Sequence, residues 1–279
     1  MLKEVFRTCR EKLQNGGIEN SDYEAQCIVE AVTGLGRAAL IAHGDTPVTD
    51  VQKRQIISIT EKRLTRYPLQ YLLGKWSFMG FPLFVGEGVL IPRDDTEVCT
   101  GLCLDYLKGK SGAKAVDLCS GSGAIAIALE KLGNADVTAI ELSGEAFDFL
   151  KKNIDLNGSK VKAVKGDVLL CHGEFPGNSL DLIVSNPPYI KKDDLRTLQK
   201  EVQFEPEMAL DGGESGFDFY EAMIRDWSGK LKPGGALVFE LGENQAEYVT
   251  ELMKQKGFEE IRTAPDFGGC ERAIIGIRN

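Results

Sequence analysis

A run of apolar residues in the middle of the chain ends in the tetrapeptide Asn186-Pro187-Pro188-Tyr189. The two prolines lack backbone N–H groups and hold the chain extended, so the tetrapeptide predicts a stiff corner at the end of a buried strand. Such a corner offers carbonyl oxygens, one carboxamide and one aromatic face, which together suit a planar NH2 group. A Pro-Pro strand terminator followed by a core tyrosine explains the same four residues equally well.

A second candidate site lies in residues 117–126, where a short strand, a glycine turn and a helix start follow one another. Glycines there let a ligand approach the backbone, and the free N–H groups of a helix N-terminus attract an anion. Glu141 ends the next predicted strand and is placed to accept hydrogen bonds from ribose hydroxyls. This spacing predicts an adenosine ligand, either NAD or S-adenosylmethionine. The proposed turn residues are Cys119, Ser120, Gly121, Ser122 and Gly123.

The position of the tetrapeptide favours one of these two ligands. In an open α/β sheet, ligands bind at the carboxyl ends of the strands. The tetrapeptide falls at that edge, beside the glycine turn, and hydride transfer has no use for it. We therefore expect S-adenosylmethionine, with Asn186 also near the cofactor.

Composition and charge argue against several other classes of protein. The apolar fraction of 43% and the charged fraction of 27% are typical of a globular protein, and no leader or long apolar run is visible, so we expect a cytoplasmic protein without membrane association. Seven scattered cysteines and two histidines predict reduced thiols and no metal site. Residues 76–279 hold 22 Lys/Arg against 33 Asp/Glu, a balance that argues against a groove for nucleic acid.

The elements that must position these residues fall into three regions. Residues 1–75 show helical spacing, with capping boxes predicted at Ser21 and Thr49 and a short helix at 68–73. Residues 76–92 are rich in aromatic residues and glycine, which predicts a β-hairpin linker. Residues 93–279 begin with a helix to about Leu107 and then alternate between strands and helices.

This alternation predicts a doubly wound, mostly parallel α/β sheet with helices on both faces. The last two strands have no helix between them, so the final strand should be antiparallel. The predicted strands are 115–118, 137–140, 161–164, 180–185, 235–241, 258–264 and 272–278, and the predicted helices are 122–131, 144–156, 216–230 and 245–256.

Several motifs in order resemble the HemK family of class I S-adenosylmethionine-dependent methyltransferases. Beside the tetrapeptide they are Ile91-Pro92-Arg93 with Thr96-Glu97, the stretch Phe204–Gly213, and Phe239-Glu240-Leu241-Gly242. The resemblance covers nearly the whole chain. It implies a seven-stranded Rossmann-like sheet, a small all-α N-terminal bundle that docks the substrate, and a hairpin linker. It also implies methylation of the glutamine in the Gly-Gly-Gln loop of class 1 peptide chain release factors.

The resemblance also implies roles for single residues. The Asn186 side-chain oxygen and the Pro187 carbonyl would accept the two N–H bonds of the glutamine amide, and Tyr189 would stack on its plane, so the whole tetrapeptide is the candidate catalytic segment. Asp167 and Val168 match the position that contacts adenine. The chain departs from the family at Asp94, Cys119 and Glu141, where proline, glycine and aspartate are usual.

Three alternatives stay open. A DNA adenine or RNA guanine methyltransferase would use a similar tetrapeptide on a flipped base. A non-catalytic protein could retain an adenosine pocket, and a dehydrogenase would bind NAD in the same turn. We expect a monomer that acts on a protein substrate and contacts no nucleic acid.

Overall fold

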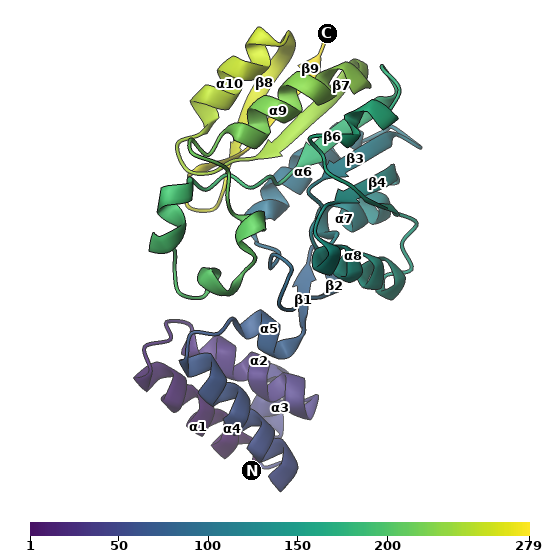
Figure 1. The fold of residues 1–279 in the computed structure, drawn as a ribbon. Helices are drawn as coiled ribbons and strands as arrows, with labels where there is room; N and C mark the ends of the chain where they lie inside the picture. The colour runs from purple at the N-terminus through teal and green to yellow at the C-terminus, as the bar shows by residue number, and fades with distance from the viewer. The chain divides into compact units, whose positions relative to one another are not determined.

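The computed structural model describes residues 1–279, which form two compact units (Figure 1). The first unit contains residues 1–74 together with 199–204, and the second contains residues 75–198 and 205–279. None of the helices combines the length and the apolar character that crossing a membrane requires.

The first unit is a bundle of short helices. Its core holds the fully buried side chains Leu2, Leu13, Ile28 and Ile56. The helices are α1 (Leu2–Asn15), α2 (Ser21–Thr33), α3 (Arg37–Ala42), α4 (Asp50–Leu64) and α5 (Leu69–Leu73).

Of the two predicted capping boxes, one is confirmed and one is wrong. Thr49 accepts from the backbone N–H of Gln52, and the Gln52 side chain accepts from the Thr49 N–H. At α2 the N-cap is Asn20 and no side-chain cap forms. Because Ser21 is already the first helical residue, its hydroxyl is not at the position that caps a helix.

Residues 199–204 lie far along the chain but pack with this bundle. Arg63 donates to both carboxylate oxygens of Glu24, at 2.7 and 3.0 Å, and to Glu201 at 3.0 Å. The ring of Phe204 meets that of Tyr67 edge to face, with centroids 5.2 Å apart. Since Arg63 is almost fully buried, the paired carboxylates satisfy a charge that would otherwise be costly.

The second unit begins with the predicted hairpin, β1 (Lys75–Phe78) and β2 (Phe81–Phe84), which pair antiparallel. Its inner side chains, Phe78 and Leu83, pack on helix α7 (Ala124–Gly133). Asn153 bonds the hairpin to the sheet domain, since its side chain accepts from the N–H of Phe84 at 2.6 Å and donates to its carbonyl at 3.1 Å. The hairpin therefore belongs to the same compact unit as the sheet.

A seven-stranded sheet forms the centre of this unit, as predicted, with the order β5-β4-β3-β6-β7-β9-β8. The final strand lies between β7 and β8 and is antiparallel to both, which confirms the expected orientation. The strands are β3 (Lys114–Leu118), β4 (Asp136–Glu141), β5 (Lys162–Lys165), β6 (Leu180–Ser185), β7 (Leu231–Glu240), β8 (Phe258–Pro265) and β9 (Glu271–Arg278).

Helices cover both faces of this sheet because successive strand residues point to opposite sides. Ala115 and Leu182 pack in a core with α6 (Asp95–Leu107), α7 and α8 (Gly144–Leu156). Val116 and Ile183 pack in a second core with α9 (Asp218–Trp227) and α10 (Ala246–Gln255). Both strand faces are apolar, as a parallel sheet buried on two sides requires.

Candidate active site

Four site residues form a row across the carboxyl edge of the sheet. Leu118 pairs with Ile140 of β4 on one side and with Ser185 of β6 on the other, and Ser185 pairs with Phe239 of β7. The next residue on each strand therefore lies at the same level. These residues are, in order across the sheet, Glu141, Cys119, Asn186 and Glu240. Chain order reverses between β3 and β6, which is where α/β sheets bind ligands.

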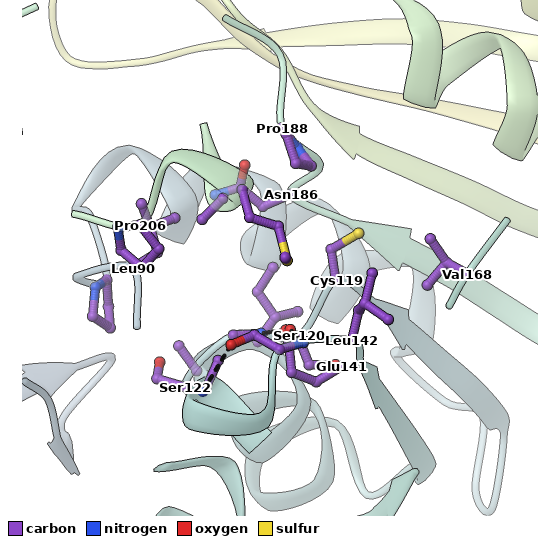
Figure 2. Close-up of a pocket in the computed structure, with 18 of the residues that line it drawn as sticks. Leu90, Cys119, Ser120, Ser122, Glu141, Leu142, Val168, Asn186, Pro188 and Pro206 are labelled. Carbon is purple, nitrogen blue, oxygen red and sulfur yellow. Dashed lines mark hydrogen bonds between the residues drawn. The ribbon is translucent and has the colours of Figure 1, made fainter. Parts of the chain in front are cut away.

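A pocket opens at this edge and encloses about 1070 Å³ of space, part of it open to solvent. Asn186 and Pro188 lie on one side of it and Ser122 and Glu141 on the other (Figure 2). Of the predicted site residues, those that line the pocket are Cys119, Ser120, Gly121, Ser122, Glu141, Asp167, Val168, Asn186 and Pro188; Gly123, Pro187 and Tyr189 do not.

The glycine turn has the backbone that a close ligand approach needs. Cys119, Gly121 and Gly123 have φ angles of 60°, 53° and 85°, all in the left-handed region. A β-carbon at Gly123 would lie 2.5 Å from Leu150, whereas at Gly121 no protein atom lies within 4 Å of that position. Gly123 is therefore needed for packing, and Gly121 leaves space at the pocket wall.

Glu141 joins the turn to the next helix. Its two carboxylate oxygens accept from the backbone N–H groups of Gly121 and Ser143, both at 2.7 Å. Burial raises the pKa of Glu141, and these two hydrogen bonds oppose the rise by favouring the charged form. Each oxygen keeps a further lone pair, so the carboxylate can still accept from ligand hydroxyls.

Asp167 and Val168 form the neighbouring wall. The Asp167 side chain accepts from the Leu169 N–H at 2.8 Å, which fixes a turn. The Val168 carbonyl accepts from the buried indole N–H of Trp227 at 2.8 Å. The Val168 side chain, 5% exposed, is thereby held at the pocket.

Ser185 anchors the start of the tetrapeptide corner, since its hydroxyl donates to the Leu118 carbonyl at 2.7 Å. Asn186 makes one side-chain hydrogen bond within the protein, from Nδ2 to the Thr96 hydroxyl at 3.3 Å. Its Oδ1 is left to accept from a ligand. The corner thus presents a carboxamide oxygen to the pocket from a rigid base.

Tyr189 is turned away from the pocket in this structure. Its hydroxyl donates to the Glu240 carboxylate at 3.2 Å, and its carbonyl accepts from Gln245 at 3.0 Å. Burial and the neighbouring Glu240 charge raise the pKa of the phenol. The predicted stacking of Tyr189 on a substrate amide therefore stays a prediction.

Two further segments line the pocket. One consists of Leu90, Ile91 and Pro92; the other contains Pro206, Met208 and Ala209. The sequence suggests that the stretch Phe204–Gly213 is either a loop flanking the substrate entrance or a set of packing residues, and it gives residues 90–92 no role in the site. Glu205 joins the two segments, since its carboxylate accepts from the Ile91 N–H at 2.9 Å and forms an ion pair with Arg93. Arg93 and Glu205 both belong to the motifs found in the sequence, but a single sequence does not show that these two residues contact each other.

The pocket contains carboxylates and no cationic side chain. Glu141 and Asp167 line it, and no lysine, arginine or histidine does. A sulfonium cation gains from nearby carboxylates. The residues present therefore fit S-adenosylmethionine.

Comparison with known proteins agrees with this geometry. Residues 4–74 match the PrmC N-terminal domain, and residues 87–215 match the methyltransferase small domain. A release factor glutamine methyltransferase from Geobacter sulfurreducens is 37% identical over 99% of this chain and 96% of its own length. One from Bordetella pertussis is 37% identical over 91% and 93%. The chain belongs to the release factor glutamine methyltransferase family.

Solved structures support the fold at greater distance. A methyltransferase from Pyrococcus furiosus superposes with a TM-score of 0.54 at 19% identity, covering 83% of this chain and all of that one. The hMettl16 catalytic domain, solved with an RNA hairpin, gives 0.58 at 15% identity and covers 82% of each chain. At such identities the likeness shows the class I methyltransferase fold. Family membership adds S-adenosylmethionine as the methyl donor.

Proposed function

We propose that this protein transfers a methyl group from S-adenosylmethionine to the side-chain nitrogen of the glutamine in the Gly-Gly-Gln loop of class 1 peptide chain release factors. The observation that carries the proposal is the Asn186 carboxamide. Its oxygen is available to a ligand, and it stands one strand away from the cofactor turn. The chain belongs to a family of glutamine methyltransferases, and the side-chain NH2 group of a glutamine can donate a hydrogen bond to that oxygen.

The residues that hold the cofactor are those of the turn and the acidic wall. Glu141 would accept from the ribose hydroxyls, Asp167 and Val168 would contact the adenine, and Gly121 would allow close approach. When bound, S-adenosylmethionine supplies an electrophilic methyl group on a positively charged sulfur.

The tetrapeptide handles the acceptor amide, whose nitrogen is a poor nucleophile because its lone pair is delocalised. Asn186 Oδ1 accepts one N–H bond of the amide. The Pro187 carbonyl, which does not line the pocket in this structure, is the proposed second acceptor. Positioning of this kind contributes up to about 7–11 kcal/mol in favourable cases. The same oxygens stabilise the positive charge that develops on nitrogen. No general base is required before transfer, because a methylated amide cation loses its proton readily.

The alternatives predict different acceptors. A nucleic-acid methyltransferase needs cationic contacts to phosphates, and residues 76–279 hold 22 Lys/Arg against 33 Asp/Glu. A dehydrogenase would bind NAD and give no methyl transfer. A non-catalytic adenosine binder would give no transfer at all.

One experiment separates these possibilities. Purified protein with labelled S-adenosylmethionine is offered a release factor, the same factor with the loop glutamine changed to alanine, and DNA. We expect label on the unmodified factor alone. Transfer to DNA alone, or equal transfer to the alanine factor, would overturn the proposal.

A further inference from the structure

Thr96, at the start of α6, lies between the Asn186 carboxamide and the Glu240 carboxylate. Its hydroxyl accepts from Asn186 Nδ2 at 3.3 Å and also interacts with Glu240, favouring the charged carboxylate. The Thr96 side chain is 4% exposed and Glu240 1%. Asn186 and Glu240 follow the paired residues Ser185 and Phe239, so the sheet holds both ends of this contact in register.

The hydroxyl of Thr96 can donate only one hydrogen bond, and we infer that Glu240 is the acceptor. Glu240 Oε1 accepts from Tyr189, but the buried Oε2 accepts no hydrogen bond of normal geometry. A buried carboxylate oxygen without a donor is costly, so it attracts the Thr96 hydrogen. The lone pairs of Thr96 then remain for Asn186, which must present its NH2 group to them.

We propose that Thr96 and Glu240 are positioning residues that hold the Asn186 carboxamide with Nδ2 inward and Oδ1 toward the acceptor amide. The proposal rests on the function proposed above, because it needs Asn186 Oδ1 to act on the substrate. A carboxamide turned by 180° would place an NH2 group against the NH2 group of the substrate and lose one of the two acceptors.

The protonation state of Glu240 gives this contact a pH dependence. Burial raises the pKa of Glu240 to about 7. Above that pH the carboxylate accepts the Thr96 hydrogen; below it, a protonated Glu240 donates to Thr96 and leaves the Thr96 hydrogen free to turn to Asn186 Oδ1. Turnover should therefore rise with pH through this range. The ionisable groups that act on Glu240 are Tyr189, Tyr220, Cys99, Asp95 and Arg272.

The test compares Thr96→Val, Thr96→Ser and Glu240→Gln at saturating substrates. Valine keeps the shape of threonine but removes the hydroxyl, so we expect kcat to fall roughly 10- to 100-fold while the Kd of S-adenosylmethionine stays within about threefold. Serine keeps the hydroxyl and should restore kcat. Glu240→Gln should resemble the protonated enzyme, with a low kcat that no longer rises between about pH 6 and pH 8.

Two results would overturn the proposal: wild-type kcat in Thr96→Val, or an equal loss of kcat and cofactor affinity that serine does not restore. If Glu240→Gln fails to fold, the pH profile of Thr96→Val decides, because that variant should lack the rise near pH 7. Asn186→Ala separates this test from the proposed function. Turnover in Asn186→Ala would refute the proposed role of Asn186, whereas a dead Asn186→Ala beside a fully active Thr96→Val refutes only the positioning role.

Discussion

Cys119 carries a β-carbon at a backbone position that favours glycine. Its φ of 60° lies in the left-handed region, where a side chain costs about 1–2 kcal/mol. The same residue lines the cofactor pocket, and burial raises the pKa of its thiol, so it stays protonated. The cysteine is thus tolerated as a small neutral side chain.

Replacing Cys119 tests this reading. Cys119→Gly should leave the unfolding free energy and cofactor affinity close to wild type, because the relief of strain is offset by the larger backbone entropy that glycine loses on folding. Cys119→Val should destabilise by about 1–3 kcal/mol, because a β-branched residue is a genuine outlier there. Urea unfolding measures both. Cys27→Val, on the regular backbone of α2, is the control, and an equal effect of valine at both sites would contradict the account.

At the scale of elements, residues 210–212 pack against the backbone directly after the tetrapeptide and help to hold the corner in place. Ile190 bonds with this segment through Leu210 and Gly212, forming an isolated bridge to Asp211. A β-carbon at Gly212 would lie 2.7 Å from the Tyr189 α-carbon and 2.8 Å from its carbonyl carbon. Since these are backbone atoms, neither can move aside without moving the corner.

Gly212→Ala should therefore lower kcat by tenfold or more, roughly the cost of a misplacement near 1 Å, while cofactor binding stays intact. Steady-state kinetics and calorimetric titration give the two quantities. Gly101→Ala is the matched control: it lies within α6, meets no atom within 4 Å, and should raise stability by about 0.5–1 kcal/mol. Equal kcat values for the two variants would show that residues 210–212 do not hold the corner.

At the scale of the whole molecule, a buried carboxyl makes the stability of the sheet unit depend on pH. Asp117 is 1% exposed; its Oδ2 accepts from the Ala126 N–H at 3.2 Å, and Oδ1 has no partner. Burial raises its pKa from 3.8 to about 7. Between these values the folded state binds more protons than the unfolded state, so this group makes stability fall as pH rises through that window.

Asp117→Asn removes this dependence while its side-chain oxygen can still accept from Ala126. The variant should gain stability relative to wild type as pH rises from about 4 to 7, with no further gain above. Urea unfolding followed by tryptophan fluorescence reports on this unit, because both Trp76 and Trp227 belong to it. A stability difference that is the same at about pH 5 and pH 8 would contradict the assignment.

Much of this architecture follows from local signals in the sequence. Apolar runs located all seven strands, and the missing helix before the last strand predicted its direction. Turn glycines and strand ends placed Glu141 and Asn186 at one edge. These features depend on residues near one another in the chain or on general rules of sheet topology.

What the sequence did not reveal depends on contacts between distant residues. The Arg63–Glu201 pair joins residues 138 apart, and the Ile91–Glu205 hydrogen bond joins residues 114 apart. The orientation of Tyr189 toward Glu240 depends on the packing of a neighbouring strand. The predicted cap at Ser21 was wrong by one residue, since α2 has Asn20 at its N-cap position, and helix boundaries are the part of an element that a sequence predicts least well.

The central claim is that the Asn186 carboxamide positions the glutamine amide for transfer. Single-turnover methylation of the release factor by Asn186→Ala, measured together with the Kd of S-adenosylmethionine, tests it most directly. We expect transfer to fall by about 10²–10³-fold or more, as when a preorganised polar group is removed from an active site, while the Kd changes much less. Transfer at the wild-type rate in this variant would contradict the account.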